Sequence, residues 1–293
     1  MSICNIKYII PSYKRANLLC KTTLKLLEEG GVDEVSLYIN KTELNDYKEA
    51  IAKYDYKISI IYKTIDFDGI GKIRNYIRNS YPSGSNLLMI DDDIDEILIK
   101  ENDVLVPLKN IKKFNEEMFK KAEENNIYLW GVQLHTNAFY MNKKYQMGLS
   151  YINGSWTGHR IDHRLKKIET NLDHFEDYLF SILHFIRDRS VLKASQVALK
   201  TKCFNAKGGI CQQKRGFDKR KEEASLNGYR LKSHFDELLY LTISKKFGVS
   251  NIRFKNIKWH SDLEKHWESY ENYNELHDKY FDPKPICDDK ITF

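Results

Sequence analysis

The sequence predicts an α/β fold in which a mostly parallel sheet is covered by helices on both faces. Over the first hundred residues, short apolar runs alternate with segments of helical periodicity, and this alternation is typical of parallel strands joined by crossover helices. The chain has 293 residues, of which 42% are hydrophobic and 30% charged, so it can bury a large core. After residue 97 the alternation stops, and the pattern predicts a mixed second half.

Four strands are predicted in the first half because each is a short apolar run that ends at a turn or at a charged residue. They are Ile6–Ile10, Val35–Ile39, Ile58–Tyr62 and Leu87–Ile90. Three helices are predicted between them, at Leu18–Glu28, Leu44–Tyr54 and Ile70–Ser80. The pair Gly30-Gly31 follows the first of these helices, and glycine commonly ends a helix.

The second half is predicted to mix helices with irregular strands. Helical periodicity predicts helices at Ile111–Glu124, His174–Arg187 and Phe235–Lys246. Strands are predicted at Tyr128–Leu134 and Ile252–Trp259, with a hairpin or irregular strands over residues 138–158. No linker rich in Gly, Pro or Ser divides the chain. We therefore expect one domain over residues 1–265 and a tail, residues 266–293, packed on it.

The composition favours a cytoplasmic protein. The five cysteines are scattered and form no Cys-x-x-Cys pair, so neither a zinc site nor a disulfide framework is indicated, and a reducing compartment fits best. We expect no signal peptide and no membrane contact, because no apolar run approaches the ~20 residues of a membrane span. The formal net charge of +6 is compatible with a polyanionic partner but does not require one.

Three consecutive aspartates, Asp91, Asp92 and Asp93, directly follow the predicted strand Leu87–Ile90. In open α/β sheets, ligands bind at the carboxyl ends of the strands. Carboxylates gathered there are hard oxygen ligands, which suit Mg²⁺ or Mn²⁺ shared with phosphates. The alternative is an acidic turn that stays solvated and only caps the next segment.

Two further segments are suited to a nucleotide. Residues 11–15, Pro-Ser-Tyr-Lys-Arg, follow the first predicted strand, where a nucleotide commonly lies. Gly69-Ile70-Gly71 precedes a helix that carries Arg74 and Asn75 early. A glycine turn at a helix N-terminus can bind an anion, and Arg74 could add a bidentate contact to a phosphate. An ordinary turn is the alternative for the glycines.

Together, "IIPSYKRANLL", "GIGKIRNYI" and "LLMIDDDI" make residues 6–97 resemble the nucleotide-sugar half of GT-A-fold glycosyltransferases. The resemblance implies that residues 98–265 form the acceptor half. It implies that Asp93 and Asp91 hold Mn²⁺ or Mg²⁺ on the sugar-nucleotide. It also implies donor contacts from Pro11, Ser12, Tyr13, Arg15, Gly71, Arg74, Asn75, Asp91 and Asp92. UDP-glucose is the first expectation for the donor, although Asn40-Lys41 stands where many relatives have aspartates.

A second acidic pair, Glu176-Asp177, lies at the start of the predicted helix His174–Arg187. Transfer with inversion needs a carboxylate that removes the proton of the acceptor hydroxyl. The resemblance implies that Asp177 is this base and that Glu176 is its partner. The spacing of Asp173 and Glu176 also fits a capping box, which would explain Glu176 without catalysis and leaves Asp177 unexplained.

Other side chains could complete the site. The aromatic candidates for the acceptor side are Trp130, Trp156 and Tyr151, with core packing as the alternative for Trp130. In some GT-A enzymes a late histidine completes the metal shell. The histidines that could do so here, between which the sequence does not choose, are His135, His159, His163, His174 and His260.

Residues 200–221 hold eight Lys or Arg residues and one acidic residue. Basic residues among glycines suit a mobile loop that closes on phosphates, and a solvated basic loop is the alternative. With this stretch, the layout resembles the GT-A enzymes of phages and large DNA viruses that glycosylate 5-hydroxymethylated pyrimidines, a branch related to the glucosyltransferase of base J. This implies double-stranded DNA as partner and an extruded base as acceptor. The expected DNA contacts are Lys207, Lys214, Arg215, Lys219 and Arg220.

Three other functions remain open. A cytosolic glycosyltransferase could act on a glycan or a protein instead of DNA. A sugar nucleotidyltransferase would share the sheet and the aspartates, but it usually has a long glycine-rich loop after the first strand, which "PSYKRANLL" lacks. A non-catalytic DNA-binding protein would leave both acidic clusters without a role.

Overall fold

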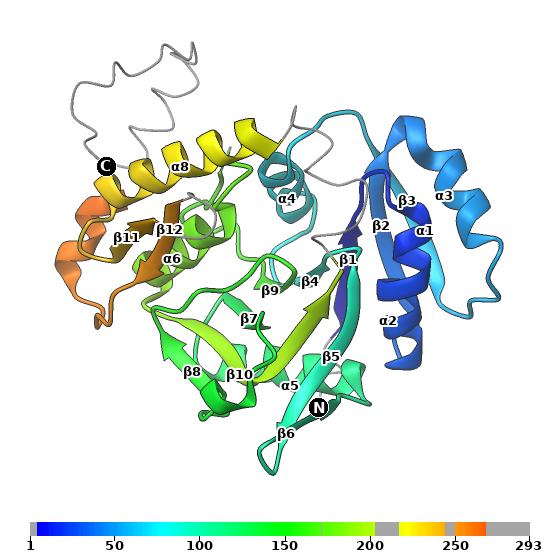
Figure 1. Cartoon of the computed structure of the whole chain (residues 1–293), viewed down its shortest axis with the longest axis horizontal. Helices are drawn as coiled ribbons and strands as arrows, with labels where there is room; N and C mark the ends of the chain where they lie inside the picture. The colour runs from blue at the N-terminus through cyan, green and yellow to red at the C-terminus, as the bar shows by residue number, and fades with distance from the viewer. Residues whose placement is uncertain (1–4, 171, 203–216, 244–249, 268–293) are drawn as a thin grey trace.

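The computed structural model describes residues 5–170, 172–202, 217–243 and 250–267 (Figure 1). Within these ranges, a ten-stranded sheet runs through the molecule and a two-stranded sheet lies at one end. The large sheet has the strand order β3-β2-β1-β4-β9-β7-β10-β5-β6, and β8 pairs with β10 outside this path. The expected mostly parallel first half and mixed second half are both present.

The first four strands are parallel neighbours, as expected. They are β1 (Ile6–Pro11), β2 (Glu34–Asn40), β3 (Ser59–Ile65) and β4 (Asn86–Ile90). Because β1 and β4 are parallel neighbours, their carboxyl ends lie at the same edge of the sheet, and the aspartate turn follows β4 there.

The second half of the sheet mixes directions. Its strands are β5 (Ile94–Glu101), β6 (Val104–Pro107), β7 (Leu129–Gln133), β8 (Tyr145–Gly148), β9 (Trp156–Arg160) and β10 (Val191–Thr201). Strand β9 lies antiparallel between β4 and β7. Strand β10 is parallel to β7 and antiparallel to β5, with an irregularity in the pairing with β7 between Ala194 and Ala198.

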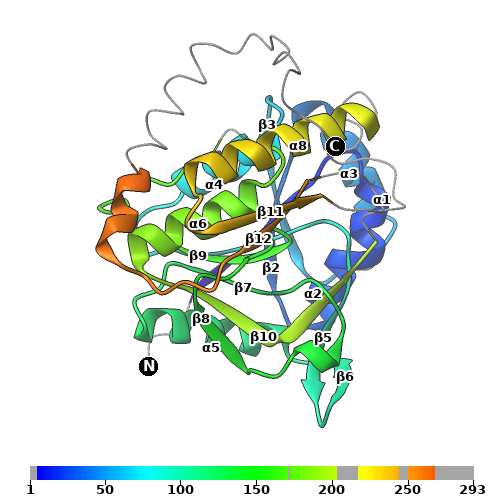
Figure 2. The ribbon, with the colours of Figure 1, turned by 60° about the vertical axis from the view of Figure 1, so that its left-hand side comes forward.

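Helices cover both faces of the sheet (Figure 2). They are α1 (Ala16–Leu19), the π-helix η1 (Cys20–Leu24), α2 (Lys25–Glu29), the 3-10 helix η2 (Lys41–Glu43), α3 (Leu44–Ile51), α4 (Ile70–Asn79), α5 (Ile111–Glu124), the 3-10 helix η3 (Ala138–Tyr140), α6 (Glu176–Asp188), α8 (Phe217–His234) and the 3-10 helix η4 (Ser261–Glu264). The first three, with α3 and α5, pack into one large core on one face. On the opposite face, α4 packs on its own cluster and α6 on another.

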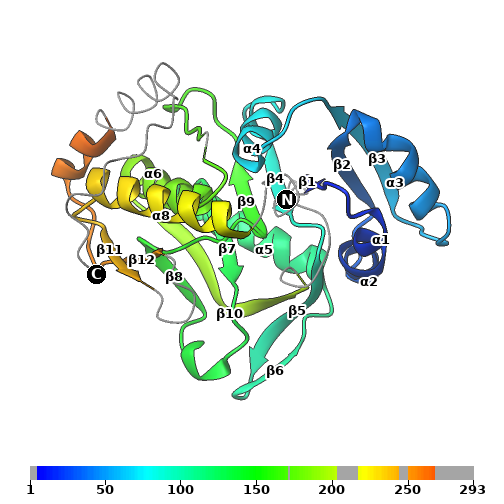
Figure 3. The ribbon, with the colours of Figure 1, turned by 45° about the horizontal axis from the view of Figure 1, so that its top comes forward.

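The region after β10 differs from the prediction. A helix was expected over Phe235–Lys246, but α8 ends at His234 and residues Leu239–Ile243 form strand β11, which pairs with β12 (Ser250–Phe254). The reason is a period of two: Leu239 is buried against α6 and α8, while Tyr240 is 55% exposed. Figure 3 shows α8 lying along α6 with this small sheet at the same end.

Strands were also expected over two other stretches of the second half. Of the two alternatives for residues 138–158, separate strands are present and the hairpin is not, because β8 pairs with β10 whereas β9 pairs with β4 and β7. The strand expected over Ile252–Trp259 ends at Phe254. No helix within the described ranges is long and apolar enough to cross a membrane.

Two buried histidines predict how stability depends on pH. The rings of His159 and His184 lie 6.5 Å apart between β9 and α6. Burial lowers the pKa of His184 to about 4, although its hydrogen bond with Asp188 acts in the opposite direction. Burial also lowers the pKa of His159 well below its ordinary value, and the charge of Arg78 lowers it further. Both rings are therefore neutral in the folded protein near pH 7.

We expect these two histidines to lower the free energy of unfolding as pH drops from 6.5 to 5, whereas Asp92, Asp93 and Glu176, whose folded-state pKa values are raised, act in the opposite direction. An unfolded histidine titrates near 6.5, so at each of these two rings the unfolded chain binds more protons than the folded one in this window. Each ring therefore contributes a slope of about 1 kcal/mol per pH unit. Denaturant titrations at several pH values measure this slope. Relative to wild type, His184→Asn should lower the slope of unfolding free energy against pH by about 1 kcal/mol per pH unit, whereas His163→Asn, at an exposed position, should leave it unchanged. Equal slopes for wild type and His184→Asn would contradict this account.

Candidate active site

The aspartate turn after β4 is held by the segment after β1. Ser12 Oγ donates to Asp92 Oδ2 over 2.5 Å. Arg15 Nη1 lies 3.0 Å from Asp92 Oδ1 and 3.1 Å from Asp93 Oδ2. Asp92 and Asp93 are buried, whereas Asp91 is half-buried. Two of the three expected donor-binding segments, residues 11–15 and the aspartate turn, therefore contact each other. Arg15, which was expected to contact the nucleotide, forms ion pairs with the turn.

The rest of the first segment lies at the same edge. Pro11 is the last residue of β1 and pairs with Tyr38 of β2. Tyr13 is half-buried, and the ammonium of Lys14 lies 5.1 Å from the centre of its ring. Tyr47 of α3 places its hydroxyl 2.6 Å from Ser12 Oγ, an interaction that the sequence analysis did not find.

Threonines of the π-helix η1 fix the backbone of the aspartate turn. Thr22 Oγ1 lies 3.0 Å from the carbonyl oxygen of Asp92, and Thr23 Oγ1 donates to that of Asp91 over 2.8 Å. Thr23 Oγ1 also accepts from the amide of Ile94. Single-turn π segments inside helices are frequent at functional sites. Neither threonine could be predicted at the site, because a Thr-Thr pair inside a helix carries no distinctive signal.

Arg74 joins the aspartate turn to the start of α6. Its Nη2 lies 2.9 Å from Asp91 Oδ1, and its Nη1 lies 2.5 Å from Glu176 Oε1. Nη2 also donates to the carbonyl oxygen of Gly154 over 2.9 Å. Arg74 is buried, at 6% exposure. We expected a phosphate contact, but in this structure its guanidinium is occupied by two carboxylates.

Gly71 and Asn75 of α4 contact the segment before α6. A side chain at Gly71 would overlap the carbonyl oxygen of Leu172, so glycine is required for close packing here. Asn75 Nδ2 donates to the carbonyl oxygen of Thr170 over 2.8 Å. The expectation that these residues approach a diphosphate is not matched by their contacts, because the neighbouring segment fills that side of the helix.

The acidic pair at the start of α6 has two different environments. Glu176 is buried at 8% exposure and paired with Arg74, whereas Asp177 is half-buried. The Tyr151 hydroxyl donates to Asp177 Oδ2 over 2.5 Å, and the amide of Tyr178 donates to Asp177 Oδ1 over 2.9 Å. Phe175, directly before the pair, has a φ of 64°, a left-handed conformation that non-glycine residues adopt mainly where function or packing imposes it.

Aromatic rings surround Asp177 on the side of α6. Tyr151 stacks on Tyr178 with ring centres 4.1 Å apart, and Tyr178 contacts Phe254 of β12 edge-on. Tyr151 thus lies at the site, as expected. Trp130 and Trp156 are fully buried, so Trp130 packs in the core as the alternative foresaw, and Trp156 does not face an acceptor.

Burial and repulsion raise the pKa values of the acidic residues. Burial raises the pKa of Asp93 to about 7, and the charges of Asp91 and Asp92 raise it further against the effect of Arg15. Burial raises the pKa of Asp92 to about 6, against Arg15 and Ser12. Burial and the charge of Asp177 raise the pKa of Glu176 to about 8, although Arg74 lowers it. The negative charge at this edge therefore exceeds what the two arginines neutralise.

Asp91 and Asp93 fit a divalent ion that is shared with a ligand. Their carboxylates repel one another, and a cation would relieve this repulsion. Magnesium is usually held by one or two carboxylates together with phosphates and water. Within the described ranges, no group of three or more His, Cys, Asp or Glu side chains could hold a metal by itself. The residues thus suit an ion that arrives with a diphosphate.

Two of the candidate histidines lie away from the aspartate turn, and the basic candidates that the structure describes lie in α8. His159 pairs with Leu87 at the start of β4, and His163 follows in the next segment, so both lie away from the aspartate turn. Lys207, Lys214 and Arg215 fall outside the described residues. Lys219 and Arg220 belong to the first turns of α8, which corrects the expectation of a loop for this part of the basic stretch.

Comparison with known proteins adds evidence on the fold. Neither the family models nor the curated proteins give a match. Among solved structures, the chain is similar to the mannosyltransferase PcManGT from Pyrobaculum calidifontis in complex with GDP-Man and Mn²⁺, with a TM-score of 0.50 and 11% identity over 69% of this chain and 58% of that one. It also resembles residues 1–349 of TarS from S. aureus in complex with UDP-GlcNAc, with a TM-score of 0.49 and 15% identity over 78% and 66%.

The similarity to the mannosyltransferase confirms the predicted fold class, a GT-A-like sheet flanked by helices. At this identity the similarity concerns the fold alone. The chain spans less than two thirds of the length of either structure. What the protein does must therefore be argued from its own residues.

Proposed function

We propose that this protein is a metal-dependent glycosyltransferase that moves a sugar from a nucleotide-sugar to a hydroxyl acceptor. One observation carries the proposal: a single guanidinium, that of Arg74, contacts both Asp91 and Glu176. The aspartates suited to a metal and the acidic pair suited to proton removal therefore lie within the span of one side chain. A solvated acidic turn would not require this arrangement.

The residues divide the reaction between them. Asp91 and Asp93 would hold the ion, which supplies positive charge to the leaving diphosphate. Asp177 takes the proton of the acceptor hydroxyl, because it is the more exposed acid of the pair and burial raises its pKa. The acceptor oxygen then bonds to the sugar as the bond to the diphosphate breaks. Glu176 and Arg74 connect the two sides and fix their separation.

The nucleotide-sugar in this proposal is UDP-linked, with UDP-glucose as the first compound to try. Ser12 and Arg15 lie at the end of β1, beside the aspartate turn. The structure of the mannosyltransferase of similar fold contains GDP-Man and Mn²⁺. A panel of donors must therefore include guanosine-linked sugars as well. Asn40, where many GT-A enzymes have an aspartate, is a second reason to test more than uridine.

Replacement of Asp93 by Asn tests the metal and donor part of the proposal. Turnover of a nucleotide-sugar with Mn²⁺ should fall by at least about a hundredfold, because a metal at a leaving phosphate contributes several kcal/mol. Release of the nucleotide diphosphate measures it. Asp95→Asn is the matched control, since this partly exposed carboxylate pairs with Lys202. Unchanged turnover in Asp93→Asn would contradict the proposed role.

For the acceptor, we propose a 5-hydroxymethylated pyrimidine in double-stranded DNA. The support is the net charge of +6 and the basic stretch over residues 200–221. Incubation with donor, Mn²⁺ and DNA that contains 5-hydroxymethylcytosine or 5-hydroxymethyluracil, followed by mass spectrometry of the nucleosides, tests it. Donor turnover that DNA does not stimulate would move the acceptor to a glycan or a protein.

The basic stretch predicts a salt-dependent affinity for DNA. Joint replacement of Lys214, Arg215, Lys219 and Arg220 by Ala should weaken binding and lower the slope of log K against log salt by about 0.9 for each phosphate that the variant no longer neutralises. Fluorescence anisotropy over a salt series measures both. A control variant removes four lysines of α5, namely Lys112, Lys113, Lys120 and Lys121. Equal effects in the two variants would indicate a general charge effect and no defined DNA site.

A further inference from the structure

A small pocket lies at the opposite end of β4 from the aspartate turn. Its volume is about 130 Å³. Arg160 and His159, which line it, pair with Asn86 and Leu87 at the start of β4, whereas Asp91 follows the end of that strand. The other walls come from the end of α4, from residues 161–168 and from the second half of α6. This basic pocket is therefore separate from the candidate active site.

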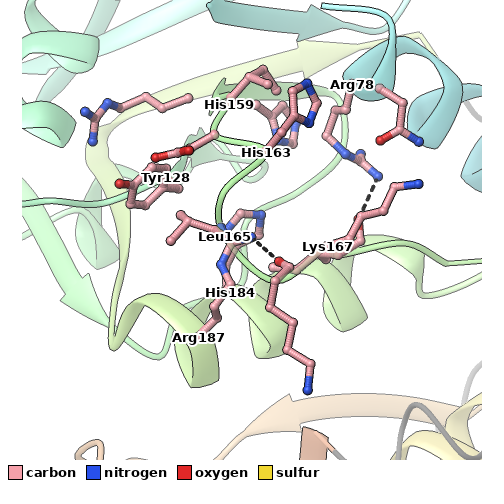
Figure 4. Close-up of a pocket in the computed structure, with 14 residues that line it drawn as sticks. Arg78, Tyr128, His159, His163, Leu165, Lys167, His184 and Arg187 are labelled. Atoms are coloured by element: carbon pink, nitrogen blue, oxygen red, sulfur yellow. Dashed lines mark hydrogen bonds between the residues drawn. The ribbon is translucent and has the colours of Figure 1, made fainter. Parts of the chain in front are cut away.

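The lining of the basic pocket is strongly cationic. Its lysine and arginine residues are Arg78, Arg160, Lys166, Lys167 and Arg187. The lining contains one carboxylate, Asp162, and this pairs with Arg164 outside the lining, 2.7 Å away. Figure 4 shows the side chains of Arg78, His163 and Lys167 arranged around the same hollow. Because like charges repel, so many cations around one cavity favour an anion within it.

Part of this charge has partners in the fold. Lys167 pairs with Glu169 at 2.6 Å, and Arg187 pairs with Asp188. Arg187 Nη1 also donates to the carbonyl oxygen of Lys166 over 2.8 Å, which holds one wall in place. For Arg160, the contacts within the described residues are the carbonyl oxygen of Ile127 and the ring of Tyr128. Its charge is therefore not met by a carboxylate there.

One residue that lines the pocket, His159, has a buried ring nitrogen for which the described part of the chain provides no hydrogen-bond partner. His159 is only 4% exposed, and its Nε2 lies 3.1 Å from Thr157 Oγ1. Its Nδ1 is buried and has no hydrogen-bond partner within the described part of the chain. Such atoms are rare in folded proteins, and an unseen ligand is one common reason for them.

We propose that the basic pocket binds a phosphate group. Arginine and lysine side chains with an imidazole N–H supply the charge-assisted donors that phosphate oxygens accept. The volume is well below the several hundred Å³ of a typical pocket for a larger organic ligand, so it suits one phosphate and not a nucleotide-sugar. Hydrogen bonds such as that from Arg187 to the carbonyl oxygen of Lys166 give some of these cations a structural role. They do not explain why a cavity remains among the cations or why His159 Nδ1 has no partner in the described part of the chain.

The first experiment titrates inorganic phosphate into the full chain at constant ionic strength, with calorimetry and with NMR of the histidine ring nitrogens. We expect saturable binding and a shift of the His159 resonance that follows the same isotherm. Lys167→Met should weaken binding about fivefold. Lys25→Met is the matched control, because Lys25 is similarly exposed and also pairs with a glutamate, Glu29, at 3.8 Å. It should leave the affinity unchanged.

The outcomes separate the sources of the phosphate and the ways the proposal fails. Competition by glucose 6-phosphate but not by a short DNA duplex identifies a small phosphorylated compound. If the duplex competes with phosphate, and Lys167→Met weakens this competition, the ligand of the pocket is a phosphodiester backbone. Absence of saturable binding, an unshifted His159, or equal losses in the two lysine variants would overturn the proposal. Donor turnover is not a readout here, so the result is independent of the proposed glycosyl transfer.

Discussion

Replacement of Asp177 by Asn is expected to lower sugar transfer about 10²–10⁴-fold, the usual contribution of a general base. Asn keeps the size of the side chain and can still accept the hydrogen bond from Tyr151, but it cannot remove a proton. Binding of the nucleotide-sugar should stay close to wild type, because the predicted donor contacts lie on the other side of Arg74. Transfer rates at saturating donor, together with donor affinity by calorimetry, measure the two effects separately.

Two neighbouring variants show whether the loss belongs to Asp177. Tyr151→Phe removes the donor to Asp177 Oδ2 and leaves the carboxylate in place, so it should lower transfer about tenfold or less. Glu176→Gln changes the buried acid that pairs with Arg74 and should affect stability as well as rate. Full transfer by Asp177→Asn would exclude Asp177 as the base and leave the acceptor side of the proposal without one.

The central strands of the first half could be predicted because they are largely buried on both faces. Strands β1 and β4 are continuous apolar runs, which the sequence displays directly. Strand β5 was missed for the opposite reason. In β5, Ile94 and Ile97 face the core while Asp95 and Glu96 are half-exposed, and such short mixed runs resemble a charged loop.

The positions of the candidate site could be predicted, but most of its interactions could not. Aspartates after a central strand lie at the ligand-binding edge of any such sheet, so a local pattern was sufficient for Asp91–Asp93. The ion pair of Arg74 with Glu176 joins residues 102 positions apart. Nothing near Arg74 in the sequence indicates this partner, and the glycine turn before it favoured a phosphate instead.

The chemical difference within the acidic pair also came from packing. In the sequence, Glu176 and Asp177 are adjacent and both lie in the first turn of a helix. The helix turns them by about 100° relative to one another, which places Glu176 under Arg74 and Asp177 beside Tyr151. Only the three-dimensional structure shows which acid is paired and which remains accessible to an acceptor.

Replacement of Arg74 by Met should lower the free energy of unfolding at pH 8 by about 3–5 kcal/mol, the usual effect of removing one partner of a buried ion pair. Asp91 and Glu176 would lose their shared cation, and Glu176 is only 8% exposed. The loss should shrink as pH falls below about 8. The pKa of Glu176 in the folded protein is raised to about 8, whereas a glutamate in the unfolded chain has an ordinary pKa of about 4.3. Below pH 8 the folded protein therefore carries a proton on Glu176, and the neutral acid needs no cation from Arg74.

The double variant Arg74→Met with Glu176→Gln distinguishes charge compensation from simple packing. If Arg74 stabilises the fold by neutralising Glu176, removing the charge of Glu176 should restore part of the stability lost in Arg74→Met, and denaturant titrations of the four proteins give the coupling energy. Gly154→Ala is a further test, because a side chain there would overlap the guanidinium of Arg74 and should reproduce part of the loss. If the two single effects simply add, Arg74 and Glu176 are energetically independent. In that case Arg74 would not be the link that holds the aspartate turn and the acidic pair of α6 at one site.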